Sequence, residues 1–384
     1  MKNIGIAIFF SIVLLLFALI NYYIIRRGLQ VVPQGSNLRT ILIIAVSFFA
    51  VAFVAGRFLE RVSVNWFTAT LIWIGSFWLG IMVYLLLQLV VIDAVRGLNA
   101  VIGFLPKFSN PETIKKTIAI VVLSVTGIIV LLGHINTWFP AIRYYELDVD
   151  KNGGNINKLH IVAFSDVHLG TTIEKRHLSI IVNKVNALNP DVILIPGDII
   201  DEDIAPVINT NVGDILKQLK AKYGVYAVTG NHEYIGGITS TRKYLAEHQI
   251  KLLNDTALLV DNSFYIVGRE DLTIKQFTSG HRKELRDIMN DVDRTKPIIL
   301  LDHQPFKLRT AEENEVDLQL SGHTHHGQLW PFNYITNLVF ELSWGYKKKG
   351  NTYYYVSSGI GGWGQPIRTV NRPEIISIKL KFNK

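Results

Sequence analysis

Four long apolar segments near the start of the chain constrain its fold more than any other feature of the sequence. The segments cover residues 4–25, 40–58, 66–92 and 114–138. Each has about 20 residues or more, enough for a helix to cross a hydrocarbon core of about 30 Å. Tyr22, Trp66 and Trp138 lie near segment ends, where aromatic side chains gather at membrane interfaces. We therefore expect residues 1–146 to form a transmembrane domain with four helices.

Two other interpretations of the apolar segments are weaker. Four buried core helices of this length would require a very large soluble core. A signal peptide at the start of the chain would have a shorter apolar run, followed by a small-residue cleavage site. The first segment is too long for this, and no such site follows it.

The basic residues of the chain are concentrated in the same region. Residues 1–146 hold 11 Lys and Arg against 4 Asp and Glu, whereas residues 147–384 hold 28 against 27. Seven basic residues lie in or beside the first and third connections: Arg26, Arg27, Arg39, Arg96, Lys107, Lys115 and Lys116. Because cytoplasmic loops are rich in Lys and Arg, we expect a multi-pass protein of the cell membrane with an extracytoplasmic C-terminal domain. The nearly balanced charge of that domain argues against a nucleic-acid partner.

The rest of the chain has the pattern of a second domain. Residues 147–157 form a polar linker with two glycines, and residues 158–384 contain short runs rich in Val, Ile and Leu. These runs end in residues that can bind metal: Asp166 and His168, Asp198, Asn231 and His232, His303, and then His323, His325 and His326. A helical stripe of apolar residues between the first two runs predicts a helix at 174–188. In α/β sheets ligands gather beyond the carboxyl ends of strands, so we expect these residues to form one site.

The chemical types and spacing of these residues indicate a metal site. In an extended segment, residues i and i+2 project to the same side, so Asp166 and His168 can reach one ion together. His323 and His325 can reach the same ion or a neighbouring one. Carboxylates, imidazoles and an amide suit Mn, Fe or Zn better than Ca or Cu(I). The chain has no cysteine, which excludes thiolate ligands and thiol catalysis.

Taken in order, the motifs resemble those of the calcineurin-like metallophosphoesterase superfamily. They read "SDVHLG", "GDIID", "GNHE", "DHQP" and "GHTHHGQ". The ending "SSGIGGWGQPIRTVNRPEI" is similar to that of membrane-anchored bacterial members. The resemblance covers residues 158–384 and implies an α/β domain in which a β-sandwich is flanked by helices.

The resemblance also implies roles for the motif residues. Those implied to hold two divalent metal ions are Asp166, His168 and His325 for the first, Asn231, His303 and His323 for the second, and Asp198 as a bridge. His232 would contact the phosphate and protonate the leaving oxygen, which makes it a catalytic residue together with Asp198. His326 and Arg368 are candidate substrate contacts. Asp201 and Glu233 are expected to support the metal loops. Asp302 precedes His303 in the sequence and is, on that ground alone, one candidate for orienting its imidazole. Manganese is the first expectation for the metal, with iron or zinc as alternatives.

The expected function is a membrane-anchored, metal-dependent phosphohydrolase. A hydroxide that bridges the two ions would attack the phosphorus of a phosphoester or pyrophosphate. Monoester, diester and pyrophosphate all remain open, and the membrane anchor favours a lipid-linked or envelope phosphate, with membrane lipids as partners. The alternative is a membrane sensor or transport component whose C-terminal domain binds metal or phosphate without hydrolysis. The sequence gives no indication of the oligomeric state.

Overall fold

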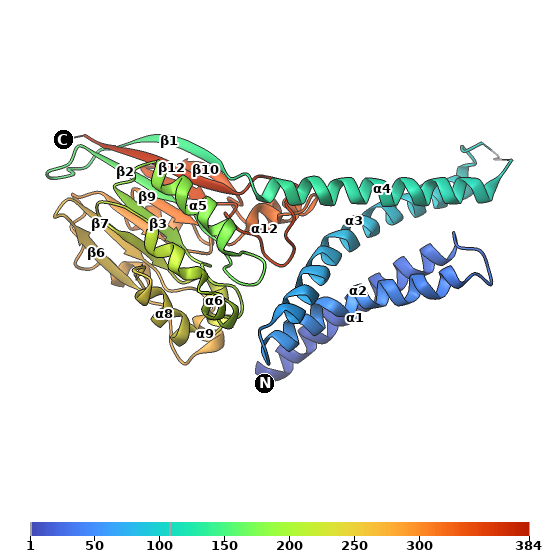
Figure 1. The fold of residues 1–384 in the computed structure, drawn as a ribbon. Helices are drawn as coiled ribbons and strands as arrows, with labels where there is room; N and C mark the ends of the chain where they lie inside the picture. The colour runs from blue at the N-terminus through green and yellow to red at the C-terminus, as the bar shows by residue number, and fades with distance from the viewer. Residues whose placement is uncertain (1, 107–108, 384) are drawn as a thin grey trace. The chain divides into compact units, whose positions relative to one another are not determined.

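The computed structural model describes residues 2–106 and 109–383, so that Lys107 of the third connection lies outside the described residues. The chain divides into two compact units, Met1–Gly133 and His134–Lys384 (Figure 1). We call the first the helical unit and the second, after its expected activity, the catalytic unit. The division falls within a helix. The stretch expected to be a linker, 147–157, begins inside a β-strand, because the strand that follows the helix continues to Val149.

The helical unit contains the apolar segments. Its helices are α1 (Lys2–Leu29), α2 (Asn37–Glu60), α3 (Trp66–Ile102) and α4 (Pro111–Thr137), the last of which continues into the catalytic unit. All four are long and apolar enough to cross a membrane. Buried side chains between them form a small cluster: Ile24, Ala50, Trp78, Met82, Leu85 and Val122. Many other large apolar side chains of these helices are exposed, as expected for surfaces that face lipid.

Two ion pairs of the helical unit lie toward helix ends. Helix α3 extends beyond its predicted end at residue 92 and thereby includes Asp93. The Asp93 carboxylate forms a close ion pair with Arg27 of α1 and accepts a hydrogen bond from Tyr23 at 2.5 Å. At the C-terminal end of α2, Arg57 lies 3.5 Å from the buried Glu60.

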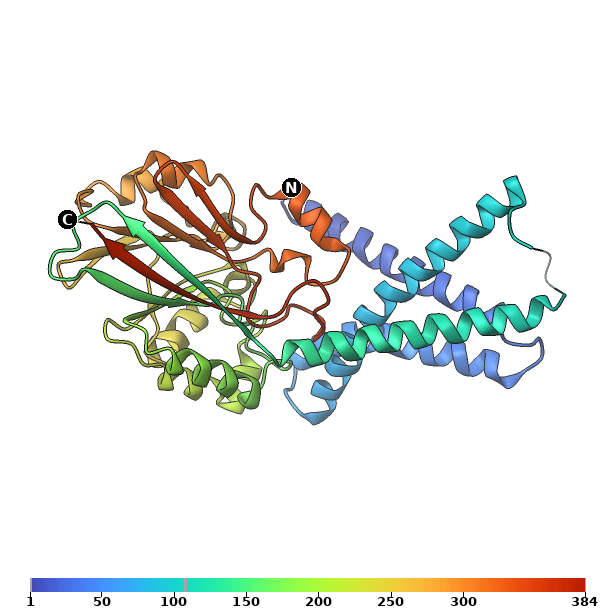
Figure 2. The same cartoon turned by 90° about the horizontal axis from the view of Figure 1, so that it is seen from above.

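The catalytic unit is built on two six-stranded sheets. In spatial order, the first contains β1 (Ala141–Val149), β12 (Glu374–Phe382), β2 (Lys158–Ala163), β3 (Val192–Pro196), β4 (Val225–Val228) and β5 (Lys251–Leu252). The second contains β10 (Gly345–Lys349), β11 (Thr352–Val356), β9 (Leu318–Ser321), β8 (Ile298–Leu301), β7 (Phe264–Gly268) and β6 (Thr256–Val260). Figure 2 shows β1 and β12 side by side, and they pair in parallel along their whole length.

The two sheets share one hydrophobic core. Ile161 and Leu194 of the first sheet belong to the same buried cluster as Ile299 and Leu318 of the second. This is a sandwich with period-two alternation, in which the inward side chains of each strand meet those of the facing sheet. The expected fold class is confirmed in its architecture: four long apolar helices are followed by an α/β domain.

Helices cover the outer faces of the sandwich. Helix α5 (Lys175–Ala187), α6 (Ala205–Thr210), the 3-10 helix η1 (Val212–Gln218) and α8 (Ile238–Glu247) contribute to the buried cluster on the first sheet. The shorter α10 (Leu285–Ile288) and α11 (Arg309–Glu313) contribute to the cluster on the second. Helix α5 was predicted at 174–188, and its apolar stripe, including Leu178 and Ile181, is fully buried. The remaining short helices are α7 (Asn231–Ile235), α9 (Ile274–Phe277), η2 (His325–Gly327) and α12 (Phe332–Val339).

Candidate metal centre

The polar residues that follow five different strands meet at one edge of the sandwich. Strands β2, β3 and β4 run parallel to one another, as do β7, β8 and β9. The residues that follow their carboxyl ends are Asp166 after β2, Asp198 after β3, Asn231 after β4, His303 after β8 and His323 after β9. The parallel order therefore explains why residues scattered along the sequence become neighbours.

One group of donors consists of Asp166, His168 and His325. Their ligand atoms all lie within 4.8 Å of one another. The Nε2 atoms of His168 and His325 are 3.0 Å apart, and Nε2 of His325 is 3.6 Å from Oδ1 of Asp166. All three side chains are buried. Two ring nitrogens and a carboxylate oxygen directed at one small volume are a donor set that fits a divalent cation.

A second group consists of Asp198, Asn231, His303 and His323. Nε2 of His303 lies 3.1 Å from Oδ2 of Asp198 and 3.2 Å from Oδ1 of Asn231. Nδ1 of His323 lies 2.8 Å from the same Asn231 oxygen. The other ring nitrogen of His303 lies 2.8 Å from the carbonyl oxygen of Pro196, and donating a proton there leaves Nε2 free for a metal ion. This second set also fits a divalent cation.

Asp198 lies between the two groups. Besides its contact with His303, its Oδ2 atom is 3.9 Å from Nε2 of His168, which belongs to the first group. Burial would raise the pKa of Asp198, but the neighbouring imidazoles of His303 and His232 hold it well below its usual value. A carboxylate that stays ionised between two donor groups is suited to a bridging position. The structure thus brings together all seven residues implied to hold metal, while their roles as ligands remain a prediction.

Glu233 accepts hydrogen bonds from two of the loops that carry donor residues. Its Oε1 accepts hydrogen bonds from the backbone N–H groups of Ile199 (2.6 Å) and Ile200 (3.0 Å). Its Oε2 accepts from the N–H groups of Gly230 (2.7 Å) and Asp198 (3.2 Å). Burial and the nearby Asp198 raise the pKa of Glu233 to about 7, although the hydrogen bonds from Ile200 and Gly230 favour the ionised form. The carboxylate therefore fixes the loop after β3 against the loop after β4, as support for the metal loops requires.

Glycine is needed at two positions beside the donors. A Cβ atom at Gly230 would collide with Oδ1 of Asp198, and one at Gly322 would collide with Oδ2 of Asp166. The backbone can therefore approach these carboxylates only where no side chain intervenes. The motif glycines before Asn231 and His323 are thus explained by close packing against the donor carboxylates.

His232 lies beside His168 of the first group, with ring centroids 4.5 Å apart, and contacts the carboxylates of Asp198 and Asp201. Its Nδ1 atom is 3.2 Å from Oδ1 of Asp201, and the same oxygen is 3.7 Å from Nδ1 of His168. Burial lowers the pKa of His232, but Asp198 and Asp201 outweigh burial and raise the pKa to about 9. At neutral pH His232 therefore carries a proton, which a general acid must do.

The two predicted substrate contacts lie in packed surroundings. Nδ1 of His326 is 2.8 Å from the hydroxyl of Ser343, and its ring is buried. Arg368 is 1% exposed, donates to the carbonyl oxygens of Ser358 and Gly361, and lies 3.3 Å from Nδ1 of His325. The structure places both residues behind the donor loops, and a contact of either one with substrate stays a prediction.

Two side chains near the centre differ from what the sequence suggested. Asp302 does not orient His303, because its carboxylate pairs with Arg269 and Arg282, and the Pro196 carbonyl lies against the imidazole instead. Trp363 was not predicted to lie near the site, yet its half-exposed ring is 6.1 Å from the ring of His232. The only signal in the sequence was a single tryptophan within the glycine-rich ending "GIGGWGQP".

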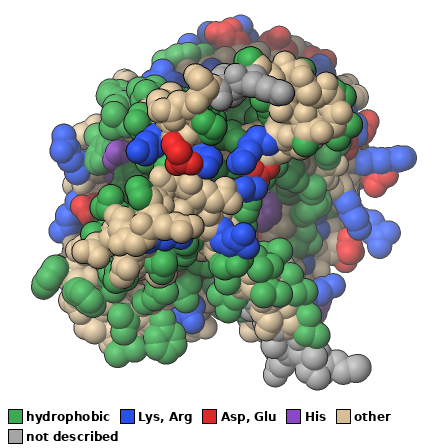
Figure 3. All heavy atoms as spheres, turned by 90° about the vertical axis from the view of Figure 1, so that its right-hand side faces the viewer, with side chains coloured by type: hydrophobic (Ala, Val, Ile, Leu, Met, Phe, Trp, Pro, Cys, Tyr) green, Lys and Arg blue, Asp and Glu red, His purple; other side chains and the backbone are tan. Residues whose placement is uncertain are grey.

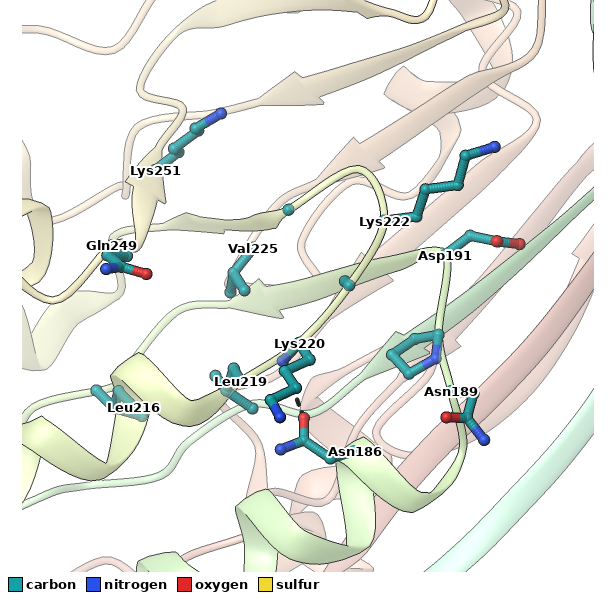
Figure 4. A pocket seen from close by; sticks show the side chains of 13 residues that line it. Asn186, Asn189, Asp191, Leu216, Leu219, Lys220, Lys222, Val225, Gln249 and Lys251 are labelled. Carbon is teal, nitrogen blue, oxygen red and sulfur yellow. Dashed lines mark hydrogen bonds between the residues drawn. The ribbon is translucent and has the colours of Figure 1, made fainter.

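A large open cavity lies at the other edge of the first sheet. It measures about 790 Å³, and Figure 4 shows Asp191, Val225 and Lys251 among its lining residues. Asp191 and Val225 stand at the amino ends of β3 and β4, whereas the metal donors follow the carboxyl ends of these strands. This cavity is therefore separate from the metal centre.

Comparisons with known proteins agree with the donor geometry. The calcineurin-like phosphoesterase family profile matches residues 159–327. A metallophosphoesterase of Campylobacter jejuni is 32% identical over 385 residues, which cover 98% of this chain and 99% of that protein. The chain belongs to the calcineurin-like metallophosphoesterase family. The cluster of His and Asp residues is the candidate metal centre of this family member.

Relatives occur in animals as well as bacteria. A protein of Danio rerio described as a transmembrane protein with metallophosphoesterase domain is 32% identical over 274 residues, 68% of this chain and 62% of that protein. This chain therefore spans less than two thirds of that relative. The 5′-nucleotidase precursor of Thermus thermophilus aligns with a TM-score of 0.37 and 11% identity over 58% of this chain and 54% of that protein, which supports no argument about function.

Proposed function

We propose that this chain is an integral membrane phosphohydrolase with two divalent metal ions, whose catalytic unit acts outside the cytoplasm on a phosphoester or pyrophosphate at the membrane. The observation that carries the proposal is the convergence of seven donors, five of them buried, from five strand ends. Asp166, His168 and His325 would hold one ion, Asn231, His303 and His323 the other, and Asp198 would contact both. Manganese, iron and zinc all suit this set of oxygen and nitrogen donors.

The chain's own residues supply positioning and a proton. Two divalent ions, when bound, would neutralise phosphoryl oxygens and make a bound water more acidic. His232 carries a proton beside the donors and is held by Asp201, so it is placed to protonate the leaving oxygen. Glu233 keeps the loops that carry Asp198 and Asn231 at a fixed distance. Because these groups are already in place, little reorganisation is required when substrate binds.

The proposed topology has four helices in the membrane and the first and third connections in the cytoplasm. A cavity of about 760 Å³ is lined by Arg26 and Arg39, from the helix ends on either side of the first connection, and by Lys115 from the start of α4. Both connections therefore lie at one end of the helical unit. Figure 3 faces this side of the molecule and shows Lys and Arg side chains gathered among hydrophobic ones. The positive-inside rule places this end in the cytoplasm. The opposite end, where α4 enters the catalytic unit, would then be extracytoplasmic.

The test is hydrolysis by the purified full-length chain. With added Mn we expect release of nitrophenol from a nitrophenyl phosphomonoester, phosphodiester or both, and a panel including lipid pyrophosphates would define the substrate class. Asp198→Asn should abolish this release while the protein remains folded. A metal-loaded, folded protein without turnover on any of these compounds would overturn the proposal in favour of a sensor that binds metal or phosphate.

A further inference from the structure

Helix α12 presents an apolar face to solvent directly after the metal-binding loop. Within α12, Tyr334 and Leu338 are four residues apart, as are Ile335 and Val339, so these four side chains share one face of the helix. All four are exposed, Leu338 by 88%, and the helix sequence "FNYITNLV" contains no charged residue. Trp330, just before the helix, is also exposed. We call these five side chains the α12 face; soluble proteins rarely leave such a contiguous patch uncovered.

The α12 face is rigidly connected to the metal centre. At the start of the helix, the backbone N–H of Phe332 donates to the carbonyl oxygen of Leu329 at 2.8 Å, three residues after His326. At its end, Asn337 accepts a hydrogen bond from the hydroxyl of Ser343 at 2.5 Å. The same Ser343 contacts Nδ1 of His326, and its carbonyl oxygen accepts from the hydroxyl of Thr324. His326 thus links α12 to the loop that carries the donors His323 and His325.

Apolar side chains also continue from α12 toward the donors. The ring of Phe340, which directly follows the helix, is 6.1 Å from the ring of His323 and 4.8 Å from the ring of Phe306. Phe306 is itself exposed. An apolar surface therefore extends from the α12 face to the edge of the metal centre.

Residues 366–371 contact both the last turn of α4 and Trp330 of the α12 face. Nδ1 of His134 lies 2.8 Å from the carbonyl oxygen of Pro366, and Asn136 donates to the carbonyl oxygens of Arg368 and Asn371 at 3.0 Å. From the same segment, the hydroxyl of Thr369 accepts a hydrogen bond from the backbone N–H of Trp330 at 2.9 Å. Figures 1 and 2 show α12 at the same end of the sandwich as this turn of α4.

The connection from the end of α4 to strand β1 is also short. Trp138, Phe139 and Pro140 are the residues between the end of α4 at Thr137 and the start of β1 at Ala141. An extended chain of this length reaches about 14 Å at most. If α4 crosses the membrane, its last turn and the α12 face are both held at the membrane surface.

We infer that the α12 face inserts into the lipid bilayer and seats the metal centre against the membrane surface. The occupant is the bilayer itself: the face has the tryptophan, tyrosine and aliphatic side chains of interfacial helices, and it carries no charge that would need an acidic partner. The nearby Lys347 and Lys349 are already paired with Glu341, so the contact is apolar rather than electrostatic. This inference rests on the proposed membrane crossing of α4 and narrows the substrate to phosphates presented at a lipid surface.

The test uses single cysteines, because the natural chain has none. Leu338→Cys would carry a nitroxide label in the full-length protein, with one copy per lipid nanodisc. Lys243→Cys is the matched control, since Lys243 is an exposed residue on the helix α8 of the same unit. Leu131→Cys, at an exposed position of α4, reports whether that helix lies in lipid. The measurement is the collision rate of each label with oxygen, which enters lipid, and with a nickel chelate, which stays in water.

The expected result is a lipid signature at Leu338 and Leu131 and a water signature at Lys243, with the ratio of oxygen to nickel collisions at Leu338 about tenfold above that at Lys243. A water signature at Leu338 with a lipid signature at Leu131 overturns the inference and leaves the membrane crossing intact. A water signature at Leu131 overturns the proposed crossing of α4, and the inference with it. Protection of Leu338 that appears only with two copies in one disc indicates contact between copies and also overturns it. None of these readings needs turnover, so they do not depend on the enzymatic part of the proposed function.

A second variant connects the α12 face to substrate. Leu338→Asp should lower turnover of a bilayer-embedded phosphate substrate by about tenfold, because an inserted leucine is replaced by a charge. Turnover of a soluble nitrophenyl phosphoester should stay within about twofold, since Leu338 touches no donor. Equal losses on both substrates would show that the substitution damages the site rather than the membrane contact, and would contradict the inference.

Discussion

The two units of this chain place their polar and apolar side chains in opposite ways. In the helical unit, large apolar side chains face outward, and polar groups are paired inside, as in the bond from Trp78 to Asn21 at 2.9 Å and from Gln88 to Thr126 at 2.8 Å. In the catalytic unit, apolar side chains fill the sandwich, and polar groups gather where strands end. The difference teaches that buried polar groups in the first unit hold helices together, whereas those in the second are arranged for chemistry.

The largest expected effect separates the proton donor from the metal donors. His232→Asn should lower the turnover of a soluble phosphoester by about 10²–10⁴-fold, because the general acid is lost. The metal content should not change, since His232 lies beside the donor groups rather than within the seven. His281→Ala, which removes an exposed histidine of the same unit, is the control and should have no effect. A loss of bound metal in His232→Asn would instead identify His232 as a ligand.

The next effect concerns the pH dependence of the metal-free catalytic unit. The pKa of His232 is raised in the folded state from about 6.5 to about 9, so its proton stabilises the fold. This contribution is fully present below about pH 6.5 and is lost as the pH rises through about 9, with a magnitude of about 3 kcal/mol. After chelator treatment, the Tm should therefore fall between these pH values.

The control for this pH dependence is Asp201→Asn, which removes one of the two carboxylates that raise the pKa of His232. In this variant the decrease in Tm should become smaller and begin at a lower pH. A Tm that rises over the same interval in the unsubstituted, metal-free protein would contradict the assignment of a protonated His232.

A smaller effect, on stability, is expected from substitution of Glu233, whose carboxylate joins the loops after β3 and β4. Glu233→Gln replaces an acceptor oxygen with an amide N–H that faces backbone donors, leaving at least one of the four unsatisfied. The free energy of unfolding of the catalytic unit should fall by about 1–3 kcal/mol for each unsatisfied donor. Thermal denaturation would measure this loss, and Glu247→Gln on the exposed surface of α8 is the control. An unchanged Tm in Glu233→Gln would show that the loops do not depend on this carboxylate.

The smallest effect tests the independence of the helical unit. Asp93→Asn removes the charge that pairs with Arg27 and should destabilise helix packing by about 0.6–1 kcal/mol, as polar contacts between membrane helices usually do. Turnover of a soluble phosphoester should not change. A large loss of turnover in Asp93→Asn would break the comparison, because it would show that a group in the helical unit controls the chemistry.

The parts of the fold that could be predicted are those with a long apolar run or a helical repeat of apolar residues. The four helices followed from uninterrupted apolar runs, and α5 followed from its stripe of Leu178, Ile181, Val182 and Val185. The helix ends were less predictable because polar residues such as Asp93 continue α3 when a partner on another helix pairs with them. Composition along the chain contains no information about such a partner.

The donors themselves were predictable because each follows a strand end, and the motifs order them. Their supporting contacts were not, because they depend on which segments meet in three dimensions. Asp302 follows the same strand as His303 but pairs with Arg269, and the carbonyl oxygen of Pro196 takes the expected place beside the imidazole. Trp363 is bonded to Gln328, and α12 is joined to the donor loop through Ser343, which are contacts between separate segments of the chain.

The most direct test of the central claim is the metal content of the purified full-length protein, measured by elemental analysis after removal of loosely bound ions. The account predicts about two divalent ions per chain, and about one after His323→Ala, because that substitution removes a donor of the second group only. The His281→Ala control should retain about two. A protein that binds no divalent metal, or whose metal content is the same with and without His323, would contradict the claim that these donors form a metal centre.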